Sequence, residues 1–245
     1  MATDTYLELV SDMIMETGLN GGNAPSSVEG AEGDARKVCY WISVADMQIQ
    51  RERIDWQFLW AREDAQLTQD SAVVPSPRNV ADADDPNQTT VLINSIAKDR
   101  LAIIDSNGES YFPTYMDWNE FSLLYGFETQ PASDYPSYWT IRPDRVILLS
   151  EPILSSDLIC RYEYWRKPLK MRTGSDTSRI PDDFSRLIIL LAKIMYAEHE
   201  DAPEVETGST AQYDIVFNQM LSVYAPMAEW QRMENSDRLL QVETR

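Results

Sequence analysis

Apolar residues recur at helical spacing near the start of the chain. In residues 6–17 the spaced positions are Tyr6, Val10, Met13, Ile14 and Thr17. Asp4 lies just before this stretch and Gly18 just after it. A 3.6-residue period followed by a glycine is typical of an amphipathic helix that ends in a left-handed turn. The pattern therefore predicts a first helix over residues 6–17, followed by a Gly-rich surface loop at 20–33.

Three further stretches show the same period. Residues 34–59 predict a long helix, which Asp34 could cap because a short carboxylate accepts the free backbone N–H groups of a first turn. A third helix is expected to begin at Pro181, and the apolar run at 187–192 predicts that it is the most buried element. Residues 198–206 are an acidic break, and a fourth helix is expected from Ser209 to the proline at 226.

The middle of the chain has a different pattern. Short apolar runs at 91–96, 101–104, 146–149 and 158–165 are separated by Pro, Asn, Asp and Gly, which is typical of strands. In the last run Cys160, Tyr162 and Tyr164 alternate with polar residues, as in a half-buried sheet. Residues 114–125 return to helical spacing, and residues 71–89 are too polar and proline-rich to pack. We expect a small β module that carries one helix.

These elements predict an α+β fold. Its core is a helical bundle of four main helices, formed by residues 1–60 and 176–226. A small antiparallel β module is inserted at 61–175, and an extended C-terminal arm follows at 227–245. No internal repeat is visible.

The predicted arm is the segment that most needs a partner. It spreads apolar residues among charges without enough chain to build a core. These residues are Trp230, Met233, Leu239, Leu240 and Val242. Elsewhere, Trp41, Trp56 and Phe184 have the spacing of core residues. Trp230 could either pack locally or anchor an interface, because large aromatic residues often dominate binding.

Charge excludes several classes of function. The 245 residues include 40 Asp and Glu against 21 Lys and Arg, so the net charge is −19. Such a chain repels phosphate backbones, and we expect no wrapping or reading of nucleic acid. The apolar fraction of 43% is too high for a disordered acidic chain. No apolar run approaches the length that spans a bilayer, and no secretory leader is visible, so a soluble protein without membrane contact is expected.

No stretch predicts catalysis or a bound cofactor. His199 lacks a second histidine at metal-binding spacing, and the lone Cys39 and Cys160 read as reduced core thiols of a cytosolic protein. The aspartates at 82–85 lack the rest of a calcium loop, and the glycines at 18–22 lack the strand and lysine of a phosphate-binding loop. We therefore expect no enzyme activity, no metal site and no cofactor.

Several short motifs appear in a familiar order. They are Glu16-Thr17-Gly18-Leu19, Trp41-Ile42, Ile49-Gln50, Asp55-Trp56, Phe112-Pro113, Trp118-Asn119, Pro136-Ser137-Tyr138-Trp139, Val146-Ile147-Leu148, Tyr162 to Leu169, and Ile180-Pro181-Asp182-Asp183-Phe184. In this order the chain resembles, over about residues 5–200, the head-to-tail adaptor or connector proteins of tailed bacteriophages. None of the motifs is a catalytic signature.

The resemblance implies a structural role in the virion. Adaptors of this kind form a ring, usually a homododecamer, that docks under the portal protein and extends the DNA channel towards the tail or nozzle proteins. It also implies that the C-terminal segment reaches the portal, and that the protein lies at the head-tail junction after a period in the host cytoplasm. The acidic composition fits a conduit through which double-stranded DNA passes without specific binding.

Other functions remain open from the sequence. A tail-completion or gatekeeper protein of the same particle would have a similar sequence. A cell-wall hydrolase that uses paired carboxylates is a second alternative, although no pair stands out among the 40 acids. An acidic binding module of unknown partner is the third.

Overall fold

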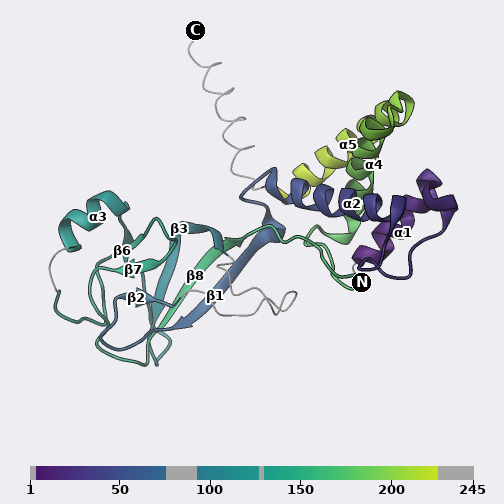
Figure 1. Ribbon diagram of the computed structural model, residues 1–245. Coiled ribbons are helices and arrows are strands. Elements are labelled where there is room, and N and C mark those ends of the chain that lie inside the picture. The colour runs from purple at the N-terminus through teal and green to yellow at the C-terminus, as the bar shows by residue number, and fades with distance from the viewer. Residues whose placement is uncertain (1–3, 76–92, 127–129, 226–245) are drawn as a thin grey trace, which may run out of the picture. The chain divides into compact units, whose positions relative to one another are not determined.

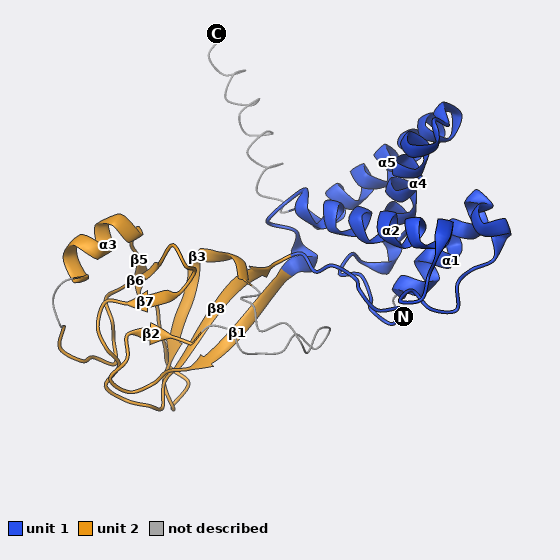
Figure 2. Cartoon of the chain, viewed as in Figure 1, with its two compact units in different colours: residues 1–59, 168–245 blue, residues 60–167 orange. Residues whose placement is uncertain are grey.

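A computed structural model describes residues 4–75, 93–126 and 130–225 of the chain. The chain divides into two compact units, each continuous in space (Figure 2). Residues 1–59 and 168–245 belong to the first unit, and residues 60–167 belong to the second. We call them the helical unit and the β unit.

Helix α1 (Tyr6–Thr17) opens the helical unit. The Thr5 side chain accepts a hydrogen bond from the Glu8 N–H, and the Glu8 carboxylate accepts one from the Thr5 N–H. This reciprocal capping box fixes the first turn. Gly18 ends the helix at φ 69°, a left-handed conformation that glycine adopts without strain. The predicted span is confirmed.

Helix α2 (Gly33–Arg51) ends eight residues before the predicted limit of residue 59. The reason is tertiary: the chain turns back after Arg51, and the Trp56 Nε1–H donates to the Ile49 carbonyl at 3.2 Å. That carbonyl lies in the last turn, where the Glu52 N–H, at 3.3 Å, is shared between it and the Gln48 carbonyl. Trp56 is fully buried and therefore keeps a helix-like apolar spacing without being helical. Asp34 does not cap the helix but lies in its first turn.

Helices α4 (Arg186–Glu200) and α5 (Pro203–Tyr224) form an antiparallel hairpin. In Figure 1 they run side by side, and α4 packs against α2. Every residue from Leu187 to Ala192 is buried, which confirms that this helix is central. The predicted start at Pro181 is wrong, because a short 3₁₀ turn (Asp182–Phe184) comes first. Helix α5 begins at Pro203, earlier than the predicted Ser209.

The β unit contains two four-stranded sheets and helix α3 (Trp118–Tyr125). The strands are β1 (Trp60–Gln66), β2 (Val73–Val74), β3 (Ile93–Ile104), β4 (Ser110–Tyr111), β5 (Thr114–Tyr115), β6 (Tyr138–Ile141), β7 (Ile147–Leu149) and β8 (Ile159–Arg166). The first sheet has the order β1-β8-β3-β4, and the second has the order β2-β7-β6-β5. Buried residues from both sheets, including Trp139 and Tyr162, form one shared core.

The predicted fold class needs correction. Within the described ranges, four α-helices lie in the helical unit and one in the β unit, in agreement with the prediction, but the β unit contains two sheets rather than one small antiparallel module. Strands β5 and β6 pair in parallel, with α3 in the connection between them. Parallel neighbours need such a crossover, whereas a hairpin joins antiparallel ones. Residues 114–115, predicted as helix, are therefore strand. The predicted C-terminal arm lies outside the described residues.

The alternation predicted for the last strand is confirmed. In β8 the side chains of Cys160, Tyr162 and Tyr164 are buried, and the intervening residues are partly exposed. The runs predicted as two strands at 91–96 and 101–104 form one strand, β3, with irregular pairing between Ile96 and Leu101. A bulge of this kind bends a strand without ending it.

Candidate functional site

The predicted interface residues lie beyond the part of the chain that the structure describes. Trp230, Met233, Leu239, Leu240 and Val242 all belong to residues 226–245, and so does the boundary of the predicted arm. The structure does describe the end of α5, from which this segment continues along the sequence. The candidate interface that the structure describes therefore lies in the helical unit, up to residue 225.

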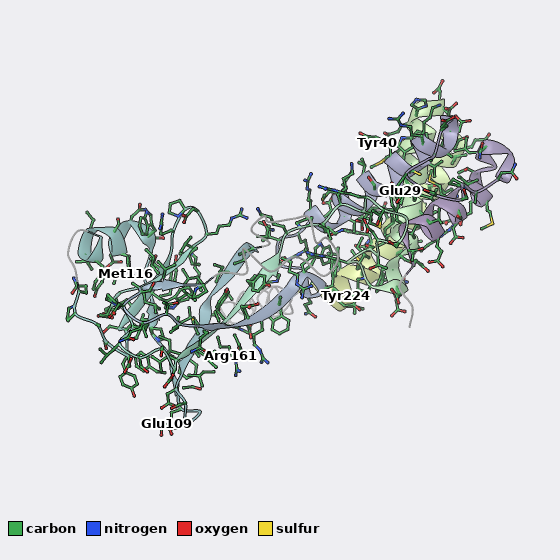
Figure 3. The ribbon with its side chains drawn as sticks, turned by 60° about the horizontal axis from the view of Figure 1, so that its bottom comes forward. Glu29, Tyr40, Glu109, Met116, Arg161 and Tyr224 are labelled. Carbon is green, nitrogen blue, oxygen red and sulfur yellow. The ribbon has the colours of Figure 1, made fainter. Side chains whose placement is uncertain are left out.

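A cluster of aromatic rings fixes the last turn of α5. The Tyr224 ring contacts the Phe58 and Phe184 rings edge-on, each at 5.8 Å between centroids. Figure 3 labels Tyr224 in the helical unit. Trp56 stacks on Phe58 at 5.2 Å and meets Phe217 of α5 at 6.1 Å. Edge-to-face and offset contacts of this kind stabilise beyond their buried area. The C-terminal end of α5 is therefore held firmly in the helical unit.

The aromatic residues predicted as core are mostly placed correctly. Trp41 and Trp56 are buried, whereas Phe184 is only half-buried. Trp41 packs edge-on against Tyr196 and His199 of α4. The α2–α4 contact therefore rests on a large aromatic side chain near the beginning of α2.

A buried carboxyl group ties α2 to the chain that returns from the β unit. Asp46 has no exposed surface; it accepts hydrogen bonds from Gln50 Nε2 at 2.8 Å and from Ser178 Oγ at 2.5 Å. Gln50 in turn donates to the Leu169 carbonyl and accepts from the Leu169 N–H. Burial raises the pKa of Asp46 to about 6, and the hydrogen bonds and the charge of Arg179 oppose the rise.

Sequence reasoning missed this network. The sequence did contain a clue to it: Asp46 and Gln50 are polar residues four positions apart on the apolar face of a helix. A polar pair at a core position needs partners, because an unpaired buried polar group is costly. The partners, at Leu169 and Ser178, are far away in the sequence.

The outer face of α2 borders a cavity of about 480 Å³. Its lining is Ser43, Val44, Met47, Gln48, Arg51, Glu52 and Lys170. We call this the α2 groove. Tyr40, labelled in Figure 3, is 61% exposed and lies one turn before Val44 on the same helix face. The groove thus combines an apolar part, Val44 and Met47, with two cations and one carboxylate, Glu52, so its lining has a small net positive charge.

The turn between α4 and α5 is strongly acidic. Five of the nine residues at 198–206 are Asp or Glu, and none is Lys or Arg. All five carboxylates are exposed. We call this the acidic tip. It begins next to the N-terminal half of α2, where Lys37 Nζ lies 3.7 Å from Glu200 Oε1.

The residues weighed for chemistry do not converge. No group of three or more His, Cys, Asp or Glu side chains within residues 4–75, 93–126 and 130–225 could hold a metal ion. His199 lies exposed at the end of α4, beside Glu200. Cys39 and Cys160 are buried free thiols in different units, and burial raises the pKa of the Cys160 thiol to about 12. The aspartates at 82–85 lie outside the described ranges.

Comparison with known protein families adds an observation that is independent of this geometry. The model of the family described as SU10 adaptor protein matches residues 4–239. The chain belongs to the SU10 adaptor protein family. The match covers nearly the whole chain, including both units. Comparison with curated proteins finds no match.

Membership gives this SU10 adaptor protein a coarse role. The family is one of phage head-to-tail adaptors, so the chain is a structural component of a bacteriophage virion. A structural family gives no support to the cell-wall hydrolase alternative. Among the helices that the structure describes, none is both long enough and apolar enough to cross a bilayer.

The β unit of this SU10 adaptor protein also exposes aromatic and charged groups. Along β1 and β8, Trp60 pairs with Trp165, and Asp64 pairs with Arg161. Arg161, labelled in Figure 3, binds Asp64 through two parallel hydrogen bonds of 2.7 and 2.8 Å. Both side chains are 42% exposed, so the pair contributes little to stability. This sheet face is a second exposed surface, separate from the α2 groove.

Proposed function

We propose that the chain forms a homo-oligomeric ring that docks under the portal protein, continues the DNA channel and joins the head to the tail. The observation that carries the proposal is the adaptor family match over residues 4–239. A ring, twelve copies by analogy with such connectors, would bind the portal on one side and tail or nozzle proteins on the other. The virion's head-tail junction would be its final location, after synthesis in the host cytoplasm.

The charge of the chain supports a passive channel. A net charge of −19 in every copy gives a ring a strongly negative field. Such a field repels the phosphates of double-stranded DNA, so the DNA slides past without binding. The proposal therefore requires no nucleic-acid site, no metal and no cofactor.

The proposed portal contact is the C-terminal segment 227–245. Its apolar residues, Trp230, Met233, Leu239, Leu240 and Val242, have the composition of interface anchors. The aromatic cluster around Tyr224 supports this assignment, because it fixes the point from which the segment leaves the helical unit. A short segment held at one end loses less freedom on binding than a free peptide would.

Sizing the protein alone and mixed with purified portal rings tests the proposal. At the dilute concentrations used for sizing, the protein alone should run as a monomer, and the mixture should give one large species of fixed stoichiometry. Deleting residues 227–245 should leave a folded monomer that no longer joins the portal. A chain with Phe112→Ala, which removes a 70% exposed aromatic ring from the β unit, is the control and should still assemble.

The outcomes separate the adaptor from its relatives in the particle. If the truncated chain assembles on portal rings as well as the full chain does, the segment is not the anchor. If the full chain leaves the portal unbound but binds tail proteins, it is a tail-completion or gatekeeper protein.

A further inference from the structure

The α2 groove carries two cations with no carboxylate partner among the residues that the structure describes. Arg51 and Lys170 both line the groove, and neither forms a salt bridge there. Lys170 lies in residues 166–172, where four of seven residues are basic and none is acidic. In a chain with twice as many acids as bases, this is a local excess of positive charge. It favours a negatively charged occupant.

The acidic tip has the opposite excess. Two of its carboxylates, Glu204 and Glu206, lie in the first turn of α5, where a helix favours negative charge. Glu198 and Glu200 lie in the last turn of α4, and Asp201 follows it. The C-terminal end of a helix carries partial negative charge, so carboxylates there are unfavourable. Glu198 and Asp201 have no ion-pair partner within the described ranges. A residue type that is unfavourable for the local structure, with no neighbouring partner to offset it, points to a functional position.

Within one copy, the tip lies far from the Arg51 end of the groove. The tip meets α2 at Lys37, and the groove lies around Arg51. Fourteen residues of α2 separate these two positions, a distance of about 21 Å along the helix. Two complementary surfaces at opposite ends of one helix can pair only between copies. A contact of this kind is heterologous, and heterologous contacts that repeat with rotation close into rings.

We propose that the acidic tip of one copy docks into the α2 groove of the next copy, around the ring. This rests on the proposed function, because it names the surfaces that join neighbouring subunits of the adaptor ring. The carboxylates of the tip meet Arg51 and Lys170, and the apolar part of the groove, Val44 and Met47, contacts the turn between α4 and α5. The charges select the partner and its orientation more than they set the affinity.

Charge reversal in two variants tests this docking. In the first, Arg51→Glu and Lys170→Glu make the groove negative. In the second, Glu198→Lys, Glu204→Lys and Glu206→Lys change the charge of the five acidic tip positions from −5 to +1. Glu198 lies in the last turn of α4 and the other two in the first turn of α5, so their effects on the helix ends oppose each other. Each variant alone repels its own copies. Equal amounts of both allow every tip to meet a groove of opposite charge.

The readout is the number of copies bound per portal ring, measured by mass photometry, with circular dichroism to confirm folding. We expect each variant alone to lower ring occupancy by about tenfold at equal concentration, which corresponds to about 1.4 kcal/mol. The equimolar mixture should restore the wild-type stoichiometry. A control variant with Arg62→Glu and Lys98→Glu makes, in the β unit, the same change of net charge as the groove variant makes in the helical unit. This control should bind the portal like the wild type.

Three results would overturn the docking: full occupancy with either variant alone, a mixture of folded variants that does not recover, or an equal loss in the β-unit control. If the wild type does not bind the portal, the proposed function fails instead. The same proteins are then compared for self-association by sedimentation, where loss in each variant and recovery in the mixture support the docking. A wild type that stays monomeric at its highest soluble concentration overturns it.

Discussion

Replacing Asp46 by asparagine removes the most deeply buried carboxyl group of α2. Asp46 has no exposed surface, and burial raises its pKa from 3.8 to about 6. A raised pKa means that the folded protein holds the proton more tightly than the unfolded chain does. The resulting stabilisation is present below pH 3.8 and is lost as the pH rises through about 6.

The size of the effect follows from the two pKa values. The difference between 3.8 and about 6 corresponds to about 3 kcal/mol once both states are ionised. About half of it, about 1.5 kcal/mol, develops between pH 5 and pH 8. This window lies above the isoelectric point of about 4.3, where the protein carries net charge and stays in solution.

The assay is urea unfolding of the wild type and of Asp46→Asn at several pH values from 5 to 8. The free energy of unfolding of the wild type should fall relative to the variant by about 1.5 kcal/mol across the range. A constant offset is expected in addition, because the asparagine can keep its oxygen toward Gln50 Nε2 only by turning its NH2 toward Ser178 Oγ, which then no longer donates to residue 46. The variant Asp34→Asn, at an exposed carboxylate, controls for the loss of one charge. Parallel curves for Asp46→Asn and wild type would refute the reasoning.

Two further substitutions test the packing and the capping of the helical unit. Trp56→Ala empties a fully buried site between the end of α2 and Phe217 of α5, and should lower the free energy of unfolding by about 3–5 kcal/mol. Urea titration measures this change. A loss below about 1 kcal/mol would contradict the packing described for Trp56. Thr5→Ala removes the capping box of α1 and should cost about 1 kcal/mol in thermal unfolding, whereas an unchanged midpoint would mean that the cap contributes nothing.

The sequence located parts of the candidate site but not their assembly. The sequence shows that residues 198–206 are acidic. That they form the exposed turn of a helical hairpin follows only from the packing of α4 against α5. The groove was invisible, because Arg51 and Lys170 come from opposite sides of the β unit in the sequence. A search for a basic stripe along the chain finds nothing, since the two cations meet only in the folded helical unit.

The sequence by itself determined the features that depend on residues close to one another along the chain. The span of α1, the alternation in β8 and the apolar run of α4 follow from local periodicity, and the order of motifs pointed to the adaptor family that the chain belongs to.

Only the tertiary structure decided where the remaining elements end and pair. Helix α2 stops at Arg51 because Trp56 folds back onto it, although the apolar period continues. Strand β5 pairs in parallel with β6 because α3 connects them, although residues 114–115 carry a helical pattern. For α2, burial of Trp56 outweighs the local preference, since propensity contributes tenths of a kilocalorie per residue whereas burying a large aromatic side chain contributes several. For β5, backbone hydrogen bonds from the Thr114 N–H to the Ser137 carbonyl and from the Met116 N–H to the Trp139 carbonyl hold the segment in the sheet.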